Sequence, residues 1–431
     1  MGFFDTGLSG LNSAAANLNV IGNNISNAET YGFKESRLNF MNMISNTMNT
    51  ANSGTNPKVG TGVNASLAVQ NFAQGVIGAT TKPMDLAING NGFFQMSDPT
   101  NSAVTYTRDG EFQLNASGVI TNSIGQQLMG YPATAGVVAV GITQPLKISS
   151  ANLAATATTA MGFAMNLAST LLAPETTTFS PDDSSSYSYT VSQTAYNQQG
   201  APQSVQLYFV ADGSGANTWN VYSTTIPTSE LNSPSTTTTS STPTPTSLGT
   251  LSFGADGTLT ATAGAFSDAT GTGFTGVPTD LTGDTTSIDL SNITQMNSAN
   301  YVNHASQNGY AAGSLTGFSV GADGLITGAY SNGQSSVVLG QVSIAKFVNP
   351  NGLKVAGNAS WSATDQSGAA LVGAPGVGSN GTLQSNALEA SSVDMASQMV
   401  ALLAAQRNYQ ASAQTIQVEN TIAQTTISMG Q

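Results

Sequence analysis

The stretch NNISNAETYGFK, residues 23–34, stands where a helical pattern ends, and it decides how the chain is divided. Before it, apolar residues follow alternating spacings of four and three, which predicts an N-terminal helix with one apolar seam. Thr30-Tyr31-Gly32 then predicts a turn that ends the helix and redirects the chain. The seam residues are Phe4, Leu8, Leu11, Ala15, Leu18, Gly22 and Ile25, with Gly22 as the weak position.

A second helix is predicted at the other end of the chain, from about Leu388 to Ile427. It would be about 60 Å long at 1.5 Å per residue. Its apolar residues recur every seven positions, which is again typical of a helix that packs along a seam. The repeating residues are Leu388, Met395, Leu402, Tyr409 and Ile416, with Met399 and Ala413 on the adjoining stripe.

The remaining faces of both predicted helices carry asparagine, glutamine and serine instead of ion pairs. Solvated helices normally carry charged pairs on those faces, whereas residues 384–431 hold the single base Arg407 against three acids. Uncharged amide faces suit helices that other subunits cover on several sides. A simpler interpretation has two amphipathic helices that pack on a nearby core of the same chain.

The residues between the two helices predict antiparallel β-structure. A strand–turn–strand pattern surrounds residues 89–92, and hairpins surround Asp256-Gly257 and Asp323-Gly324, because Asp-Gly supplies the positive φ of a tight turn. Residues 224–247 are rich in Thr, Ser and Pro, which predicts an exposed loop that buries little apolar area. One β-domain is therefore expected to begin, to receive an inserted second domain, and then to finish.

The predicted fold class is mixed: all-β outer domains, one inserted in the other, flanked by terminal helices that pair as a coiled-coil-like inner domain. Residues 1–30 would form the N-terminal helix and residues 31–72 an extended connecting segment. The first β-domain would consist of residues 73–149 and 299–375, with residues 150–298 inserted as the outer β-domain. Residues 376–431 would form a connecting segment and the C-terminal helix.

Composition excludes several classes of function. The net charge is −13, and no Lys or Arg occurs between Lys147 and Lys346, so neither a nucleic-acid-binding face nor attraction to anionic lipid is expected. The chain has no cysteine, which excludes disulfides and thiolate zinc sites. The first base is Lys34, so a secretory signal peptide with a charged start is not expected. The longest strongly apolar run, Met399 to Ala405, is far too short for a membrane span.

No catalytic, cofactor-binding or metal-binding residues are predicted. His304 is the only histidine, and a surface position is far more common for a lone histidine than a place in a catalytic triad. Asp182 and Asp183 are adjacent, so in a strand they would point to opposite faces. No glycine is followed by the lysine that a P-loop needs.

The blocks at residues 23–34, 85–94, 106–112, 130–131, 388–394 and 405–410, taken together, resemble the bacterial flagellar rod and hook proteins. Residues 23–27 and 30–34 resemble the family's N-terminal signature, and residues 85–94, 106–112 and 130–131 resemble its next blocks. Residues 388–394 and 405–410 are similar to its C-terminal helix. Ala28-Glu29 departs from the family pattern. The signature residues are Asn23, Asn24, Ile25, Asn27, Thr30, Gly32, Phe33, Lys34, Gln406, Arg407, Tyr409 and Gln410.

The resemblance implies a structural, non-enzymatic role in the flagellum, and the large insertion points to the hook proteins within the family. Many copies would form a curved tube that acts as a universal joint and transmits torque from the basal-body rod to the filament. Partners would be copies of the chain, the distal rod and hook–filament junction proteins, the hook cap and the flagellar export apparatus. The chain would lie outside the cell, exported without a cleaved signal peptide. Gly32 would form the exit turn of the inner helix, since glycine takes a φ that bulkier residues resist.

Three other interpretations remain open at this point. A distal rod or another axial component is the nearest, although the insertion disfavours it. A secreted β-rich adhesin would suit the acidic Gly/Thr/Ser composition, but it gives no reason for paired terminal helices. A peptidoglycan hydrolase that accompanies the rod is the third, and an assay of muramidase activity tests it.

Overall fold

The computed structural model describes residues 2–44, 60–134, 136–149, 152–170, 173–176, 178–213, 217–227, 245–264, 273–278 and 285–429. The chain forms two compact units. The terminal unit comprises Met1–Ser150, Gly317–Ala329 and Gln334–Gln431, and the inserted unit comprises Ala151–Thr316 and Tyr330–Gly333. None of the described helices is both long and apolar enough to span a bilayer.

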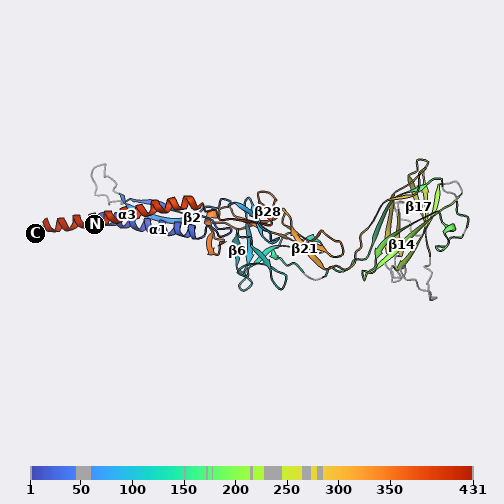
Figure 1. Ribbon diagram of the computed structural model, residues 1–431, viewed down its shortest axis with the longest axis horizontal. Coiled ribbons are helices and arrows are strands. Elements are labelled where there is room, and N and C mark those ends of the chain that lie inside the picture. Colours follow the sequence, from blue (N-terminus) through green and yellow to red (C-terminus); the bar gives the residue numbers. More distant parts are fainter. Residues whose placement is uncertain are drawn as a thin grey trace. The chain divides into compact units, whose positions relative to one another are not determined.

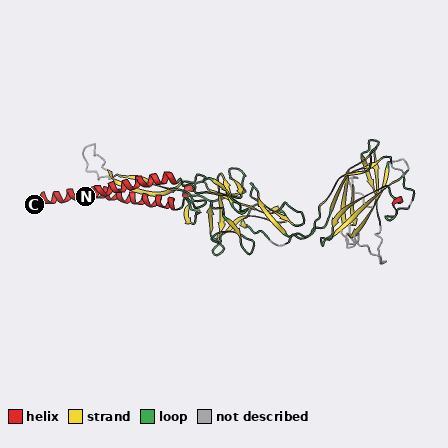
Figure 2. Cartoon of the chain, viewed as in Figure 1, coloured by secondary structure: helices red, strands yellow, loops and turns green. Residues whose placement is uncertain are grey.

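One end of the terminal unit is a helical layer. Helices α1 (Gly2–Ser26) and α3 (Met395–Met429) pack side by side, and the antiparallel strands β1 (Ser36–Ile44) and β2 (Gly60–Gln70) lie against α1 (Figures 1 and 2). The Ser9 hydroxyl accepts a hydrogen bond from the Val63 N–H at 3.3 Å, which fastens the hairpin to the helix. The helices therefore pair with each other and with a hairpin of the same chain.

The rest of the terminal unit is β-structure. A 14-stranded sheet has the main order β21-β22-β23-β9-β5-β6-β26-β25, and the pairs β4–β28 and β3–β29 join segments far apart in sequence. Phe93, Tyr106, Phe347 and Trp361 form a buried aromatic core. The strands are β3 Ile77–Ala79, β4 Leu86–Asn89, β5 Phe93–Ser97, β6 Val104–Thr107, β7 Phe112–Leu114, β8 Ile120–Asn122, β9 Gln127–Thr134, β10 Val137–Val138, β11 Gln144–Pro145, β21 Leu315–Val320, β22 Leu325–Tyr330, β23 Val337–Val342, β24 Ile344–Lys346, β25 Lys354–Gly357, β26 Ser360–Ser362, β27 Leu371–Gly373, β28 Thr382–Ser385 and β29 Ala387–Glu389, with the 3-10 helix η2 at Pro350–Gly352.

The inserted unit is a sandwich of two sheets around one core. Strand β12 shows why, because Met161, Phe163, Met165 and Leu167 alternate along it and are all buried. These side chains face those of the second sheet, whose largest contribution is Trp219. One sheet has the order β18-β19-β12-β20 and the other β13-β14-β15-β16-β17. The elements are β12 Ala160–Ala168, β13 Tyr189–Tyr196, β14 Pro202–Ala211, β15 Thr218–Pro227, β16 Thr246–Phe253, β17 Leu259–Ala263, β18 Gly273–Pro278, β19 Thr285–Met296 and β20 Tyr301–Gln307, with the 3-10 helix η1 at Ser184–Ser186.

The mixed fold class is confirmed: two nested β-units with terminal helices that pack together. Several boundaries differ from expectation. Tyr301–Gln307 pairs with β12 and so belongs to the inserted unit, beyond the boundary expected at residue 298. Residues 31–72 contain the β1–β2 hairpin, not only an extended connection. The two strands around residues 89–92 do not pair with each other, since β4 pairs with β28. Most of the expected Thr/Ser-rich loop, residues 228–244, lies outside the described residues.

The start of the C-terminal helix is a correction to the sequence prediction. The helix begins at Met395, and Leu388 lies instead in β29, where it pairs with Gly78 of β3 and is buried. Asp394 explains the start, because its carboxylate accepts a hydrogen bond from the Ala396 N–H at 3.0 Å, as a helix N-cap does. The seven-residue repeat of the helix therefore begins at Met395 and does not include Leu388.

Candidate assembly site

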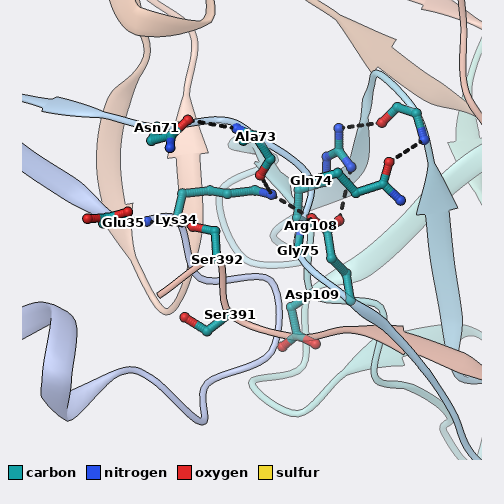
Figure 3. A network of polar contacts seen from close by, with 12 residues as sticks. Lys34, Glu35, Asn71, Ala73, Gln74, Gly75, Arg108, Asp109, Ser391 and Ser392 are labelled. Carbon is teal, nitrogen blue, oxygen red and sulfur yellow. Dashed lines mark hydrogen bonds and ion pairs between the residues drawn. The ribbon is translucent and has the colours of Figure 1, made fainter. Parts of the chain in front are cut away.

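The polar centre of the terminal unit is Glu389, a carboxylate with no solvent exposure. Its Oε1 lies 2.5 Å from Lys34 Nζ, and its Oε2 lies 3.0 Å from Arg108 Nη1. The Gly75 N–H donates a third hydrogen bond to Oε1 at 2.8 Å. Figure 3 shows how Lys34 and Arg108 reach this point from different segments. The triad thus joins the end of the N-terminal signature, the first β-strands and the approach to the C-terminal helix.

Burial makes this triad electrostatically demanding. Desolvation lowers the pKa of the Lys34 amine and of the Arg108 guanidinium, and in both the adjacent Glu389 carboxylate opposes that shift. Two cations share one carboxylate, and carbonyl groups supply further acceptors: Lys34 Nζ donates to Ala73 O at 2.7 Å and Arg108 Nη2 to Gly90 O at 2.8 Å. The buried Arg108 Nε has no hydrogen-bond partner among the described residues. The guanidinium carbon also lies 5.4 Å from the centre of the Phe93 ring. Removing Glu389 would leave two buried cations without a counter-charge.

Backbone hydrogen bonds hold the same three segments together. The Gly32 N–H donates to Glu389 O at 2.8 Å, and the Ser392 N–H donates to Phe33 O at 3.1 Å. The Glu35 N–H in turn donates to the Ser392 hydroxyl at 2.9 Å. The turn after α1 and the strand before α3 therefore run against each other as a short, fixed junction.

Asn24 connects the C-terminal end of α1 to the N-terminal end of α3. Its side-chain amide donates to Ser36 O at 2.8 Å and to Gln398 Oε1 at 3.2 Å, and its carbonyl accepts from the Ser36 N–H at 3.0 Å. Gln398 also donates to Glu35 Oε1 at 2.7 Å. Asn24 is only 1% exposed, so its own side-chain bonds are shielded from water at the Asn24 end. An asparagine is needed here because it offers both a donor and an acceptor.

Gly32 has the conformation that its place in the turn suggested. Its φ is +67°, in the left-handed region that favours glycine. A Cβ atom there would lie 2.4 Å from the Asp109 backbone nitrogen, so the turn also passes directly against the β-domain. We call the triad, the Asn24 bonds and this turn the joint.

Only some of the expected signature residues lie in the joint. Asn24, Gly32 and Lys34 are in it, and Ile25 and Phe33 are half-buried nearby. Asn23, Asn27 and Thr30 support the helix end instead: Asn27 Nδ2 donates to Asn23 O at 2.9 Å, and Thr30 Oγ1 donates to Asn27 Oδ1 at 3.3 Å. The C-terminal signature residues Gln406, Arg407, Tyr409 and Gln410 are all exposed on α3, away from the joint.

Sequence reasoning missed Arg108, Glu389 and Gln398 as members of one site. A signal was present, because so few residues of this chain are charged that each acid or base in a signature block is conspicuous. Arg108 and Glu389 nevertheless lie 281 positions apart, and spacing along the chain does not show that they meet.

The contact between α1 and α3 uses small residues. A Cβ added to Gly7 would lie 2.9 Å from Ile416, and one added to Gly10 would lie 3.4 Å from the Ser412 hydroxyl. Ala14 and Ala405 are buried in the same layer. Side chains this small let the two helix backbones approach closely. A cavity of about 200 Å³ remains where the helices meet the hairpin, lined in part by Ser13, Phe40 and Asn408.

The predicted seam residues are only partly covered within one chain. On the described side chains, Leu8, Met395, Met399 and Tyr409 are exposed, whereas Leu11, Ala15, Leu18, Ile25, Leu402 and Ile416 are half-buried. A strict seven-residue repeat drifts by about 20° per repeat around a straight helix. This drift carries the stripe of α3 from an exposed Met395 to Ile416, which reaches α1. The side chain of Phe4 lies outside the described residues.

The side chains considered for catalysis or metal binding are His304 and the acidic residues. His304 lies on β20 with an exposed side chain. No group of three or more His, Cys, Asp or Glu residues placed to hold a metal ion occurs among the described residues.

Comparison with known proteins agrees with the fold. Family models match at residues 4–34 (flagella basal body rod protein), 87–159 (flagellar hook protein FlgE/F/G D1 domain), 166–310 (flagellar basal body protein FlaE D2 domain) and 384–429 (flagellar basal body rod FlgEFG protein C-terminal). The chain is 39% identical to the flagellar hook protein FlgE of Escherichia coli K12 over 430 residues, which is 99% of each chain. It is 37% identical to that of Salmonella typhimurium, with the same coverage.

A solved structure shows the same fold at low identity. The Helicobacter pylori flagellar hook protein FlgE2 aligns with a TM-score of 0.52 and 14% identity, and it covers 72% of this chain and 100% of its own. Paired terminal helices, nested β-units and the four matched regions define a structural protein of the bacterial flagellar rod and hook class. Within that class, the full-length similarity places the chain in the family of flagellar hook proteins. Its function is that of a structural subunit of the flagellar hook.

Proposed function

We propose that copies of the chain polymerise through the helical layer into a curved tube that carries torque from rod to filament while bending. The observation that carries this proposal is the exposure of Leu8, Met395 and Met399 on helices that are already packed together. Exposed apolar stripes on long helices favour burial against further helices. A contact between unlike faces of identical subunits generates an open helix instead of a closed ring.

The joint has a mechanical part in this proposal. Torque must pass between the helical layer and the β-domain of each subunit, and within the terminal unit these regions are connected through the junction around Glu389. Buried, mutually satisfied ion pairs and hydrogen bonds resist rearrangement more than exposed ones, because breaking one partner leaves the other unpaired in a low dielectric. We therefore assign to the joint the role of keeping helices and β-domain in one fixed orientation.

The same proposal implies which proteins the chain contacts and how it leaves the cell. The tube would contact the distal rod protein at one end, the junction protein at the other, and the hook cap during growth. Subunits would leave the cell through the flagellar export apparatus without a cleaved signal peptide. The chain would have no enzymatic activity, and a muramidase assay on purified subunits is expected to give no signal above a buffer control.

Electron microscopy of basal bodies from a strain that lacks this gene tests the proposal. We expect complete rods that carry neither hook nor filament, restored by the gene on a plasmid. Truncated rods would show instead that the chain is a component of the rod. Normal hooks in the deletion strain would overturn the role altogether.

Leu402→Asp is expected to block hook assembly while the β-units stay folded. The half-buried Leu402 lies on the predicted seam of α3, and a carboxylate there would have to be buried without a partner when a second helix covers it. The measurement is the number of hooks per basal body, with circular dichroism of the purified subunit as a check on folding. Leu402→Met keeps volume and polarity and should assemble normally. Normal hooks from Leu402→Asp would exclude this stripe from the contact.

A further inference from the structure

A second exposed stripe runs along α3, and the seven-residue repeat did not indicate it. Val400, Leu403, Val418 and Ile422 follow one face at spacings compatible with a helix, and each is more than half exposed. Arg407 lies within the same stripe and is the only base of α3. The buried Ala405 is two residues from Arg407, which is about 200° around the helix. This outer stripe, Val400, Leu403, Arg407, Val418 and Ile422, therefore faces away from α1.

Glu419 lies nearer to α1, and one of its carboxylate oxygens has no hydrogen-bond partner among the described residues. Its Oε2 would be 3.1 Å from a Cβ on Gly7, so it is covered by the first turns of α1. This oxygen is shielded from water and accepts no hydrogen bond from any described residue. Polar atoms shielded from water nearly always have a hydrogen-bond partner, and a carboxylate without one is costly. Among the described residues of one chain, none supplies the missing donor.

Arg407 is not able to supply that donor within the same chain. Twelve residues separate Arg407 from Glu419, which corresponds to about 18 Å along the helix and a third of a turn around it. The Arg407 side chain is exposed, and it forms no ion pair among the described residues. Judged by the described residues, α3 thus carries an unpaired cation and a carboxylate oxygen without a partner on different faces, which is charge complementarity suited to two copies of the chain.

We propose that a second copy of the chain docks on the outer stripe of α3, with Arg407 of one copy paired to Glu419 of the next. This inference rests on the proposed polymerisation. It adds which face of α3 makes the contact and how far the two helices are displaced along their axes. The two helices would be displaced by about 18 Å along their axes, the distance that brings the two charges level. Because the cation and the carboxylate lie on different faces, the contact is between unlike surfaces and repeats from copy to copy.

Arg37 is the main competing base among the described residues of the helical layer. It is exposed on β1, whereas Lys34 and Arg108 are already engaged at the joint. Arg37 directly follows Ser36, which is bonded to Asn24 near the base of α1, and Glu419 lies at Gly7 near the opposite end. Seventeen residues of α1 separate those two points, or about 26 Å. Arg37 therefore serves as the matched control for Arg407, since pairing it would require a different register.

Cysteine cross-linking tests the register directly, because the chain has no cysteine of its own. Arg407→Cys and Glu419→Cys are expressed as separate copies in one cell, and purified hooks are oxidised. A disulfide needs Cα atoms within about 7 Å, so the two positions are too far apart to bridge within one helix. We expect a covalent dimer on a non-reducing gel that requires both variants. Gln406→Cys with Glu419→Cys is the control and should give at least about tenfold less dimer, since Gln406 is on a different face.

Charge exchange gives a second and independent test. Arg407→Glu and Glu419→Arg should each lower the number of hooks at least about tenfold, and the double variant should restore them, as close charge pairs couple at interfaces. Arg37→Glu should leave hook numbers unchanged. Hooks that assemble from all variants, or that form without the expected dimer, overturn the pairing but leave polymerisation intact. A deletion strain with normal hooks would instead overturn the proposed function.

Discussion

Replacing Glu389 by alanine is expected to lower the stability of the terminal unit by about 3–5 kcal/mol, the usual cost of removing one partner from a buried ion pair. The Lys34 amine and the Arg108 guanidinium would both remain buried without a carboxylate, and the Gly75 N–H would lose its acceptor. Few single substitutions cost this much. Hooks are expected to be absent at growth temperature or to detach under load.

The two tryptophans make this measurement specific. Trp361 is buried in the terminal unit beside Phe93, and Trp219 is buried in the inserted unit. In a Trp219→Phe background, the fluorescence of Trp361 follows denaturant unfolding of the terminal unit alone, which matters because two units seldom unfold as a single two-state system. The midpoint for Glu389→Ala should fall clearly below that of the background protein.

Two control variants separate the joint from ordinary charge effects. Glu111→Ala removes the exposed pair with Lys82, at 3.1 Å, and should leave the midpoint unchanged because surface pairs contribute little. Lys34→Met removes one of the two cations and leaves Arg108 and Glu389 balanced, so it should cost less than Glu389→Ala. A larger loss for Lys34→Met than for Glu389→Ala would contradict the shared-carboxylate account.

Local pattern in the sequence predicts much of this fold. The helix before residue 27 and the hairpin turns at Asp256-Gly257 and Asp323-Gly324 depend on neighbours within a few positions, and those neighbours are visible in the sequence. The start of α3 was predicted too early because Leu388 fits a seven-residue repeat and is also a good strand residue. Its pairing with Gly78, far away in the sequence, decides between the two. Long-range pairing of this kind overrides local periodicity.

The joint was predicted only in part for the same reason. Asn24, Gly32 and Lys34 stand in one short signature, whereas Arg108 and Glu389 come from two other blocks. Only the folded chain brings the three together. The outer stripe of α3 was missed for a different reason: its apolar residues are interrupted by Arg407 and by glutamines, and the stronger repeat through Leu402 masked it. A helix with contacts on several sides carries overlapping patterns, and one period does not describe them all.

The low charge of the chain gives these few ion pairs their importance. Charged residues are 7% of the sequence, so polar contacts in the helical layer depend mainly on amides and hydroxyls. Amide contacts are neutral and tolerate small displacements, whereas a buried ion pair requires one geometry. Buried ion pairs at the joint, and a helix α3 whose only charged residues are Arg407 and Glu419, thus suit a subunit that is rigid inside and has few fixed charge contacts with its neighbours.

Gly32→Ala is expected to be nearly as damaging as the loss of Glu389. The new methyl group would have to occupy a φ of +67°, which costs about 1–3 kcal/mol for a non-glycine residue. It would also lie 2.4 Å from the Asp109 backbone nitrogen, where no flexible side chain can give way. The turn would have to open, which breaks the 2.8 Å hydrogen bond from Gly32 to Glu389 and separates the end of α1 from the strand before α3.

Gly22→Ala is the matched control, since it makes the same chemical change ten residues earlier. Gly22 lies inside α1, and a Cβ there would meet nothing within 4 Å. Alanine is favoured over glycine in a helix by about 0.8–1.0 kcal/mol, so this variant should raise the Trp361 midpoint or leave it unchanged, with normal hooks. Gly32→Ala should lower the midpoint and the hook count together. Equal behaviour of the two variants would show that the turn at Gly32 does not constrain the helices.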